Sequence, residues 1–336
     1  MKIGIYFDLR NPGQGRSWPA VYTEALEVIE EAERLGAASV WLTEHHLFDD
    51  GYLPQPLVFA AAIAARTTRL RIGTAVLLAP LKRVAELAEE AALVDILSGG
   101  RLELGLGAGY RRSEFAALGA DFSARVRSLD DSVIGLRKLW AEGKVTPPPV
   151  QDPVPLWLGY HQPAGARRAG RLGAGLLSLR PHLLGPYLEG INDGGHQPET
   201  AKVSGVVNMM LSDDPERTSV MAAPHVAYRV DSYARHGADP DGPIPPAVDP
   251  VIYHRSPRDQ LRFPVPGPRG EPPPFVFATP AEAAALLLDS LGAAPVDHVF
   301  FWADAPGLDP EIARRHVELP CTELGPLVSG AAPRPD

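Results

Sequence analysis

The sequence predicts a single closed (β/α)8 barrel, an α/β fold of eight parallel strands enclosed by helices. Short β-like runs alternate with amphipathic helical stretches, which favours parallel strands joined by helical crossovers. Eight such strands can be placed in the 336 residues, so one barrel uses the chain without a linker. A doubly wound open sheet is the competing architecture.

The elements follow one another in a regular order. Strands are indicated by runs of β-branched, aromatic and aliphatic residues, and helices by apolar residues three and four positions apart. The predicted strands are 2–7, 39–43, 70–78, 101–107, 156–159, 175–179, 203–211 and 297–302. The predicted helices are 19–36, 56–66, 82–97, 125–142, 163–173, 278–292 and 309–319, with another beginning at Asp214-Pro215.

Helix ends support these assignments. Gly36 ends the first helix, and Ser98-Gly99-Gly100 stops the one that covers 82–97. Thr279, followed by Pro and then by Glu282, has the spacing of a capping box at the start of the helix over 278–292.

Composition excludes several classes of protein. Apolar residues make up 45% and charged residues 22%, which is globular. The net charge of -9 argues against a nucleic-acid partner. Charge or glycine interrupts every apolar stretch before about 20 residues, so no membrane span is expected. Cys321 is the single cysteine and the N-terminus does not read as a signal peptide, so we expect a cytoplasmic protein.

Residues 238–278 interrupt the alternation. They hold twelve prolines in 41 positions, a density that predicts neither a helix nor a central strand. A disordered insertion is one interpretation. We favour an ordered lid over the C-terminal mouth of the barrel, docked through Phe263, Phe275 and Phe277. We therefore expect one domain over 1–325, with a flexible tail at 326–336.

The stretch "VWLTEHH" carries the strongest chemical signal. Glu44, His45 and His46 follow a predicted strand directly, and active sites of barrels lie at the carboxyl ends of the strands. Adjacent side chains of an extended chain point to opposite sides, so His45 and His46 do not suit one metal ion, and no metal site is predicted. A catalytic imidazole is the functional interpretation, and a capping histidine beside a solvated one is the alternative.

Two further loops are candidate binding elements. "GLGAGY" has Tyr110 where a dinucleotide-binding loop needs its last glycine, so its glycines are interpreted as backbone clearance for a ligand or as a plain turn. "GYHQPAG" leads from a strand into a helix whose free N–H groups suit a phosphate. Tyr160, His161 and Gln162 would add side-chain donors there.

At these residues the chain resembles the bacterial luciferase-like flavin monooxygenases. The resemblance rests on "WLTEHH" (41–46), "RIGTAVLLAP" (71–80), "EEAALVDILSGGRLELGLGAGYRRSEFAALG" (89–119) and "TPAEAAALLLDSLGAAPVDHVFF" (279–301). It implies a TIM barrel that binds reduced FMN at its C-terminal mouth. It also implies that the flavin reacts with O₂ to give a C4a-peroxyflavin, which oxygenates a small organic substrate.

The resemblance also assigns roles to residues. His45 would act at the flavin edge with Glu44 beside it, and Ala75–Val76 would be a non-proline cis peptide under the flavin ring. Ala108 stands where luciferase itself has a phosphate-binding Arg. The cofactor contacts then expected are Phe7, Ala75, Val76, Gly107, Tyr110, Arg111, Tyr160, His161 and Gln162.

Partners and alternatives follow from the same resemblance. No NAD(P)H site is evident, so a separate reductase would deliver reduced FMN, and a homodimer through early barrel helices is expected. One alternative is an F420-dependent oxidoreductase of the same superfamily, whose members often have an Asp-His pair where this chain has Glu44-His45-His46. Another is a flavin-binding barrel without catalysis. The substrate is not readable from the sequence.

Overall fold

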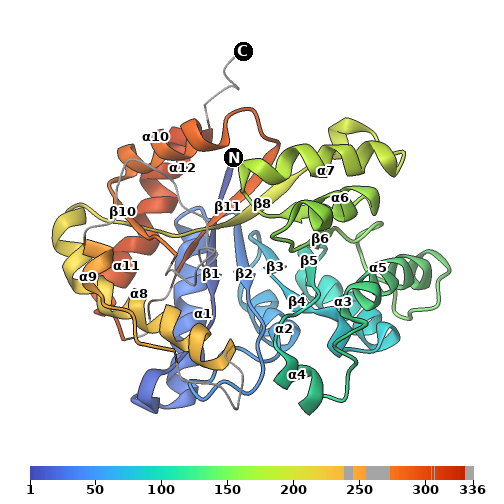
Figure 1. Ribbon diagram of the computed structural model, residues 1–336, viewed down its shortest axis with the longest axis horizontal. Helices are drawn as coiled ribbons and strands as arrows, with labels where there is room; N and C mark the ends of the chain where they lie inside the picture. The colour runs from blue at the N-terminus through green and yellow to red at the C-terminus, as the bar shows by residue number, and fades with distance from the viewer. Residues whose placement is uncertain (238–244, 255–272, 304, 306, 330–336) are drawn as a thin grey trace.

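The computed structural model describes residues 1–237, 245–254, 273–303, 305 and 307–329, and it confirms the closed barrel. The strands follow the order β3-β2-β1-β11-β8-β7-β6-β5-β4, and all neighbouring pairs are parallel. β3 also pairs with β5, which closes the sheet. Figure 1 shows the strands gathered at the centre with helices around them.

Apart from one strand inside the insertion, the strands match the predicted ones, with two breaks. Their bounds are β1 Lys2–Phe7, β2 Ser39–Leu42, β3 Arg71–Thr74, β4 Leu77–Leu78, β5 Leu102–Gly107, β6 Leu156–Leu158, β7 Gly175–Leu177, β8 Val203–Val207, β9 Met209–Leu211, β10 Val276–Ala278 and β11 Val296–Trp302. The single strand predicted over 70–78 is interrupted at Ala75–Val76, between β3 and β4. The strand predicted over 203–211 ends at Val207, because β9 leaves the barrel to pair with β10.

The helices include four that the sequence pattern did not predict, and the last of these, at 325–329, overlaps the tail that was expected from residue 326 onward. Their bounds are α1 Trp18–Arg34, α2 Pro56–Arg66, α3 Val84–Ser98, α4 Arg112–Ala117, α5 Arg125–Ala141, α6 Pro163–Arg171, α7 Pro181–Asp193, α8 Pro215–Gly237, α9 Val251–His254, α10 Pro280–Leu291, α11 Pro310–Leu319 and α12 Gly325–Ser329. α4 has only six residues, and α7 contains Gly185, Pro186 and Gly190, which obscure its periodicity. The capping box at Thr279 and Glu282 is confirmed.

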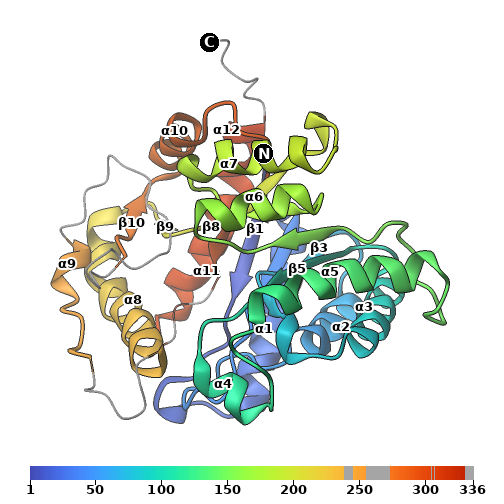
Figure 2. The ribbon, with the colours of Figure 1, turned by 45° about the vertical axis from the view of Figure 1, so that its right-hand side comes forward.

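The insertion is structured at its described ends. Val251–His254 form α9 and Val276–Ala278 form β10, so the prediction that 238–278 holds no helix was wrong. Among the described residues, Pro250 directly precedes α9, and Pro273 and Pro274 lie shortly before β10, so neither element is interrupted by proline. Phe275 and Phe277 are buried and belong to the same apolar cluster as residues of α8. In Figures 1 and 2, α8, α9 and β10 lie together on the side opposite α3 and α5. Phe263 and the rest of 255–272 lie outside the described residues, as do 238–244 and the end of the tail.

Large aromatic side chains fill the interior of the barrel. The Trp41 ring stacks on Phe300 with centroids 5.0 Å apart, and it meets Trp157 edge-on at 5.9 Å. Glycines on neighbouring strands make this possible, since a Cβ at Gly73 would lie 2.2 Å from Trp41 and one at Gly175 2.2 Å from Trp157. The barrel is therefore a packed core, as expected for eight strands.

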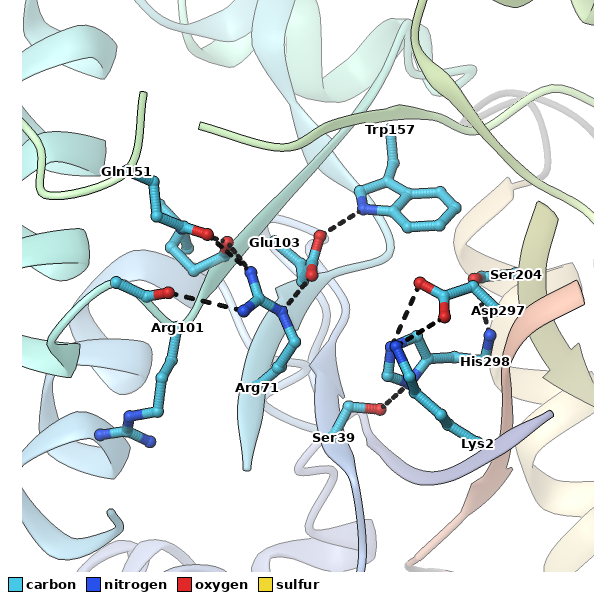
Figure 3. Close-up of polar contacts among 12 residues, drawn as sticks. Lys2, Ser39, Arg71, Arg101, Glu103, Gln151, Trp157, Ser204, Asp297 and His298 are labelled. Carbon is cyan, nitrogen blue, oxygen red and sulfur yellow. Dashed lines mark hydrogen bonds and ion pairs between the residues drawn. The ribbon is translucent and has the colours of Figure 1, made fainter. Parts of the chain in front are cut away.

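Polar side chains near the first residues of several barrel strands contact one another, as Figure 3 shows. The Glu103 carboxylate contacts Arg71 and accepts a hydrogen bond from Trp157 Nε1 at 2.7 Å. Ser39 Oγ lies 2.8 Å from His298 Nδ1. We interpret the charge pairing at this end as structural, because the chemistry of such barrels is located at the opposite end.

No helix in the described part of the chain is long and apolar enough to cross a membrane. Among the same residues, no group of three or more His, Cys, Asp or Glu side chains is placed to hold a metal ion.

Candidate functional site

The end of β2 places Glu44, His45 and His46 at the C-terminal mouth, and the two histidines have different carboxylate partners. His46 Nε2 lies 2.9 Å from Glu44 Oε1. The other Glu44 oxygen accepts the backbone N–H of Leu78 at 2.5 Å. Glu44 therefore links the β2 end to β4, and both of its oxygens already have a partner within the fold.

His45 contacts a carboxylate that the sequence did not single out. Its Nδ1 lies 2.9 Å from Oε1 of Glu114, which is on α4 and fully buried. The Tyr110 hydroxyl lies 3.3 Å from the other ring nitrogen, Nε2. His45 is thus held from both sides by residues that follow β5. The sequence signal was available in "YRRSEF", where Glu114 follows Tyr110 by four residues, but the helix there is too short to be recognised.

Arg111 joins three segments around this pair. Its Nη1 donates to the His46 carbonyl at 2.7 Å and to Glu114 Oε1 at 3.1 Å. Its Nε donates to the carbonyl of His236, at the end of α8, at 2.6 Å. The guanidinium also lies over the Phe48 ring, 4.5 Å from its centroid. Arg111 therefore fastens the β2 loop, α4 and α8 to one another.

Burial and charge determine the protonation of the pair. Burial lowers the pKa of His45 below its ordinary value, although the Glu114 carboxylate acts in the opposite direction. Burial alone would raise the pKa of Glu114, but hydrogen bonds from His45 and the His46 N–H, together with the charge of Arg111, bring the pKa below its usual range. The site therefore holds a neutral imidazole beside an ionised carboxylate at neutral pH.

Aromatic rings surround His45. Phe48 stacks on the imidazole at 4.9 Å, and Tyr52, Tyr110 and Tyr233 meet it edge-on at 4.9, 5.3 and 5.9 Å. Tyr233 comes from α8, so this helix covers part of the mouth. His45 is therefore only 6% exposed, although the Tyr110 side chain itself is 54% exposed.

A buried network of charges lies next to these rings, and the sequence did not predict it. Arg10 Nε lies 3.0 Å from Asp8, and Arg229 Nε of α8 lies 3.3 Å from the same carboxylate. The Arg10 guanidinium stands over the Tyr233 ring at 4.2 Å. Ser232 of α8 donates to Asp50 at 2.6 Å. These contacts join α8 to the loops after β1 and β2.

The bond between Ala75 and Val76 is cis, as the resemblance implied. The Tyr6 hydroxyl donates to the carbonyl of Ala75. A Cβ added at Gly107 would lie 2.4 Å from the Val76 side chain, and one at Gly159 2.6 Å from it. Gly107 therefore provides clearance for Val76 itself, which sits between the ends of β5 and β6.

The remaining predicted cofactor contacts have no hydrogen bond or ring contact with His45 among the described residues. Phe7 packs in the core between strands and helices, whereas Tyr6 belongs to the cluster inside the barrel. Tyr160 packs against Gly165 at the start of α6, and its buried hydroxyl has no hydrogen-bond partner among the described residues. His161 and Gln162 are exposed beside it. The structure thus brings His45, Tyr110 and Arg111 together, whereas residues 160–162 follow β6 and lead into α6.

A family model described as luciferase-like monooxygenase matches residues 1–242. The chain belongs to the luciferase-like monooxygenase family. Among curated members, it is 27% identical over 199 residues to the oxygenase component of the flavin-dependent trigonelline monooxygenase of Acinetobacter baylyi, a match that covers 54% of this chain and 55% of that protein. It is 32% identical over 175 residues to an F420-dependent glucose-6-phosphate dehydrogenase of Amycolatopsis mediterranei, covering 46% and 52%. The chain thus spans about half the length of these curated relatives.

Solved structures of luciferase-like proteins share the fold over nearly the whole chain. A monooxygenase from Streptomyces bottropensis superposes with a TM-score of 0.77 at 24% identity, covering 97% of this chain and 99% of that one. The oxygenating constituent of 3,6-diketocamphane monooxygenase from Pseudomonas putida, in complex with FMN, superposes at 0.71 and 17% identity over 100% of both chains. Flavin-dependent and F420-dependent enzymes both occur among the relatives, so the family is one of oxidoreductases.

Proposed function

We propose that this chain is the oxygenase component of a two-component flavin monooxygenase, which uses reduced FMN from a separate reductase and O₂ to oxygenate a small organic substrate. The observation that carries the proposal is a buried, neutral His45 at the mouth, held between Glu114 and Tyr110. The match to a relative named as an oxygenase component supports the proposal that a separate protein, the reductase, supplies the reduced flavin.

The residues present fit a flavin. The cis bond between Ala75 and Val76, with glycines on either side of the Val76 side chain, would support the flat ring. Tyr160 has a buried hydroxyl without a partner among the described residues, and α6 begins with no side-chain cap. A hydroxyl donor beside free helix N–H groups suits the phosphate. Reduced flavin, when bound, supplies the reactivity toward O₂.

The chain's own residues would perform three tasks. His45, which is neutral at physiological pH, accepts a proton at Nε2 near the flavin edge. Phe48 and Tyr233, which pack against that imidazole, would keep water from it, and this would protect reactive species from decomposition. Arg111 keeps α8 closed over the mouth through its bond to the His236 carbonyl.

Cofactor binding provides the decisive experiment. The purified protein is titrated without oxygen with photoreduced FMN, and separately with reduced F420, and is then mixed rapidly with oxygenated buffer. We expect reduced FMN to bind and to reappear as oxidised flavin more slowly than free reduced FMN does. Tight binding of reduced F420, with no binding of reduced FMN, would instead establish the hydride-transferring alternative and overturn the proposal.

A variant at His45 tests the catalytic assignment. His45→Gln removes the proton acceptor, so we expect turnover to fall by about 10² or more while reduced FMN still binds. As the pH falls, the wild-type rate should decline with an apparent pKa below the ordinary range of histidine, because burial lowers the pKa of His45. Unchanged turnover in His45→Gln would remove this residue from the mechanism.

The proposal includes a homodimer formed through α2 and α3. Leu93 and Leu97, one helical turn apart on α3, and Val58 on α2 are 50%, 57% and 71% exposed. Large exposed apolar side chains on adjacent helices favour association. Leu93→Glu should convert a dimer to a monomer in size-exclusion chromatography with light scattering, and a monomeric wild type would contradict this part of the proposal.

A further inference from the structure

We infer that Glu114 is the positioning residue that selects the tautomer of His45 and so leaves Nε2 as the proton acceptor at the mouth. This inference rests on the proposed function for its catalytic consequence, but the tautomer itself is a property of the protein alone. The carboxylate adjacent in sequence, Glu44, bonds to His46 instead and leaves the orientation of His45 to α4.

The hydrogen bonds determine which ring nitrogen carries the proton. Oε1 of Glu114 receives the His46 N–H at 2.7 Å, Arg111 Nη1 at 3.1 Å and His45 Nδ1 at 2.9 Å. An ionised carboxylate only accepts hydrogen bonds, so Nδ1 of His45 must be its protonated nitrogen. In the neutral ring Nε2 is then the acceptor, and the Tyr110 hydroxyl donates to it at 3.3 Å.

The surroundings of the hydrogen bond between His45 and Glu114 stabilise it. Glu114 is fully buried and His45 is 6% exposed, so water does not compete for the bond between them. Arg111 compensates the charge of Glu114 and is itself held by the His46 and His236 carbonyls. An imidazole whose second nitrogen is fixed by a carboxylate is oriented and made more basic than the same ring in an apolar pocket.

Other charged and titratable groups also face His45. They are Tyr110 and Arg111 before α4, Arg10 after β1, Tyr52 after β2 and Tyr233 on α8. The two arginines oppose protonation of the imidazole, and Glu114 favours it. Removing the Glu114 charge therefore lowers the affinity of His45 for a proton.

The test uses the full chain labelled with ¹⁵N-histidine and needs no flavin. In the wild type we expect a protonated Nδ1 and an unprotonated Nε2 for His45, assigned by comparison with His45→Gln. Glu114→Gln should mix the two tautomers and shift the titration of His45 to lower pH. Asp95→Asn, which alters a buried carboxylate on α3 that bonds Gln151, is the matched control and should leave the His45 signals unchanged.

Either of two results would overturn the inference. One is a wild-type His45 that carries its proton on Nε2, which is measurable even if Glu114→Gln fails to fold. The other is a His45 with the same tautomer and titration in wild type and Glu114→Gln.

A rate measurement tests the catalytic consequence. In Glu114→Gln, kcat should fall by about 10-fold or more and its acid limb should move to lower pH, while KM changes little. A protein that shows no flavin-dependent oxygenation would refute the proposed function, whereas the tautomer measurement would still decide the role of Glu114.

Discussion

Acid should destabilise this protein in part through one buried histidine, His316 on α11. Its Nδ1 accepts the Leu211 N–H at 2.9 Å, so in the neutral ring Nε2 donates to the Trp302 carbonyl, also at 2.9 Å. The side chain thereby connects α11 to β9 and β11. Burial lowers the pKa of His316 to about 4, from an ordinary value of 6.5.

The size of the effect follows from this shift. The unfolded chain binds the proton at a higher pH than the folded one, so stability is complete above about pH 6.5 and is lost as the pH falls toward 4. Between about pH 7.5 and about pH 5, this single group removes about 2 kcal/mol from the free energy of unfolding. The loss stops growing below about pH 4, where the folded protein is protonated as well.

Denaturant unfolding at several pH values, followed by circular dichroism, measures the effect. His316→Gln cannot titrate, so the wild type should lose about 2 kcal/mol more than the variant over that interval, whatever their stabilities at neutral pH. His298, whose burial also lowers its pKa to about 4, is present in both proteins and cancels. His182→Gln, at an exposed position, should retain the wild-type loss. Parallel stability curves for wild type and His316→Gln would refute the reasoning.

Four further substitutions probe the barrel by thermal and denaturant unfolding. Gly105→Ala places a Cβ 1.9 Å from the Thr74 carbonyl oxygen and should lower the free energy of unfolding by at least about 1–3 kcal/mol. Gly185→Ala is the control, because it lies in α7 with no atom within 4 Å of the added Cβ, and it should stabilise the protein by up to about 1 kcal/mol. Equal changes in the free energy of unfolding for the two variants would contradict this account of the packing. Thr279→Ala removes the capping box and should lower the free energy of unfolding by about 1 kcal/mol. An unchanged free energy of unfolding in this variant would disprove the role of the cap. Glu103→Ala leaves the half-buried Arg71 without its carboxylate and the buried Trp157 Nε1 without its acceptor, so it should cost about 1–3 kcal/mol. Reduced FMN should bind as before, because the change is at the opposite end of the barrel from the mouth.

Much of the fold was predictable because its determinants are local. The pattern of apolar residues along a strand or helix indicates which face of that segment is buried. Helix caps are also local, since the capping box of Thr279 and Glu282 joins residues three positions apart. The same reasoning fails where a helix contains proline or glycine or is very short. The helical pattern of α7 is interrupted by Pro186, and α9 has only four residues, which are too few to show a periodicity.

By itself, the sequence determined the order of strands and helices, and therefore that Glu44, His45 and His46 end a barrel strand at the mouth. Only the tertiary structure decided their partners: Glu114 reaches His45 from 69 residues away, Glu44 turns to His46, and Tyr6 rather than Phe7 enters the barrel. The physical reason is that periodicity encodes burial within a segment, whereas a hydrogen bond between segments depends on where closure of the sheet brings their ends.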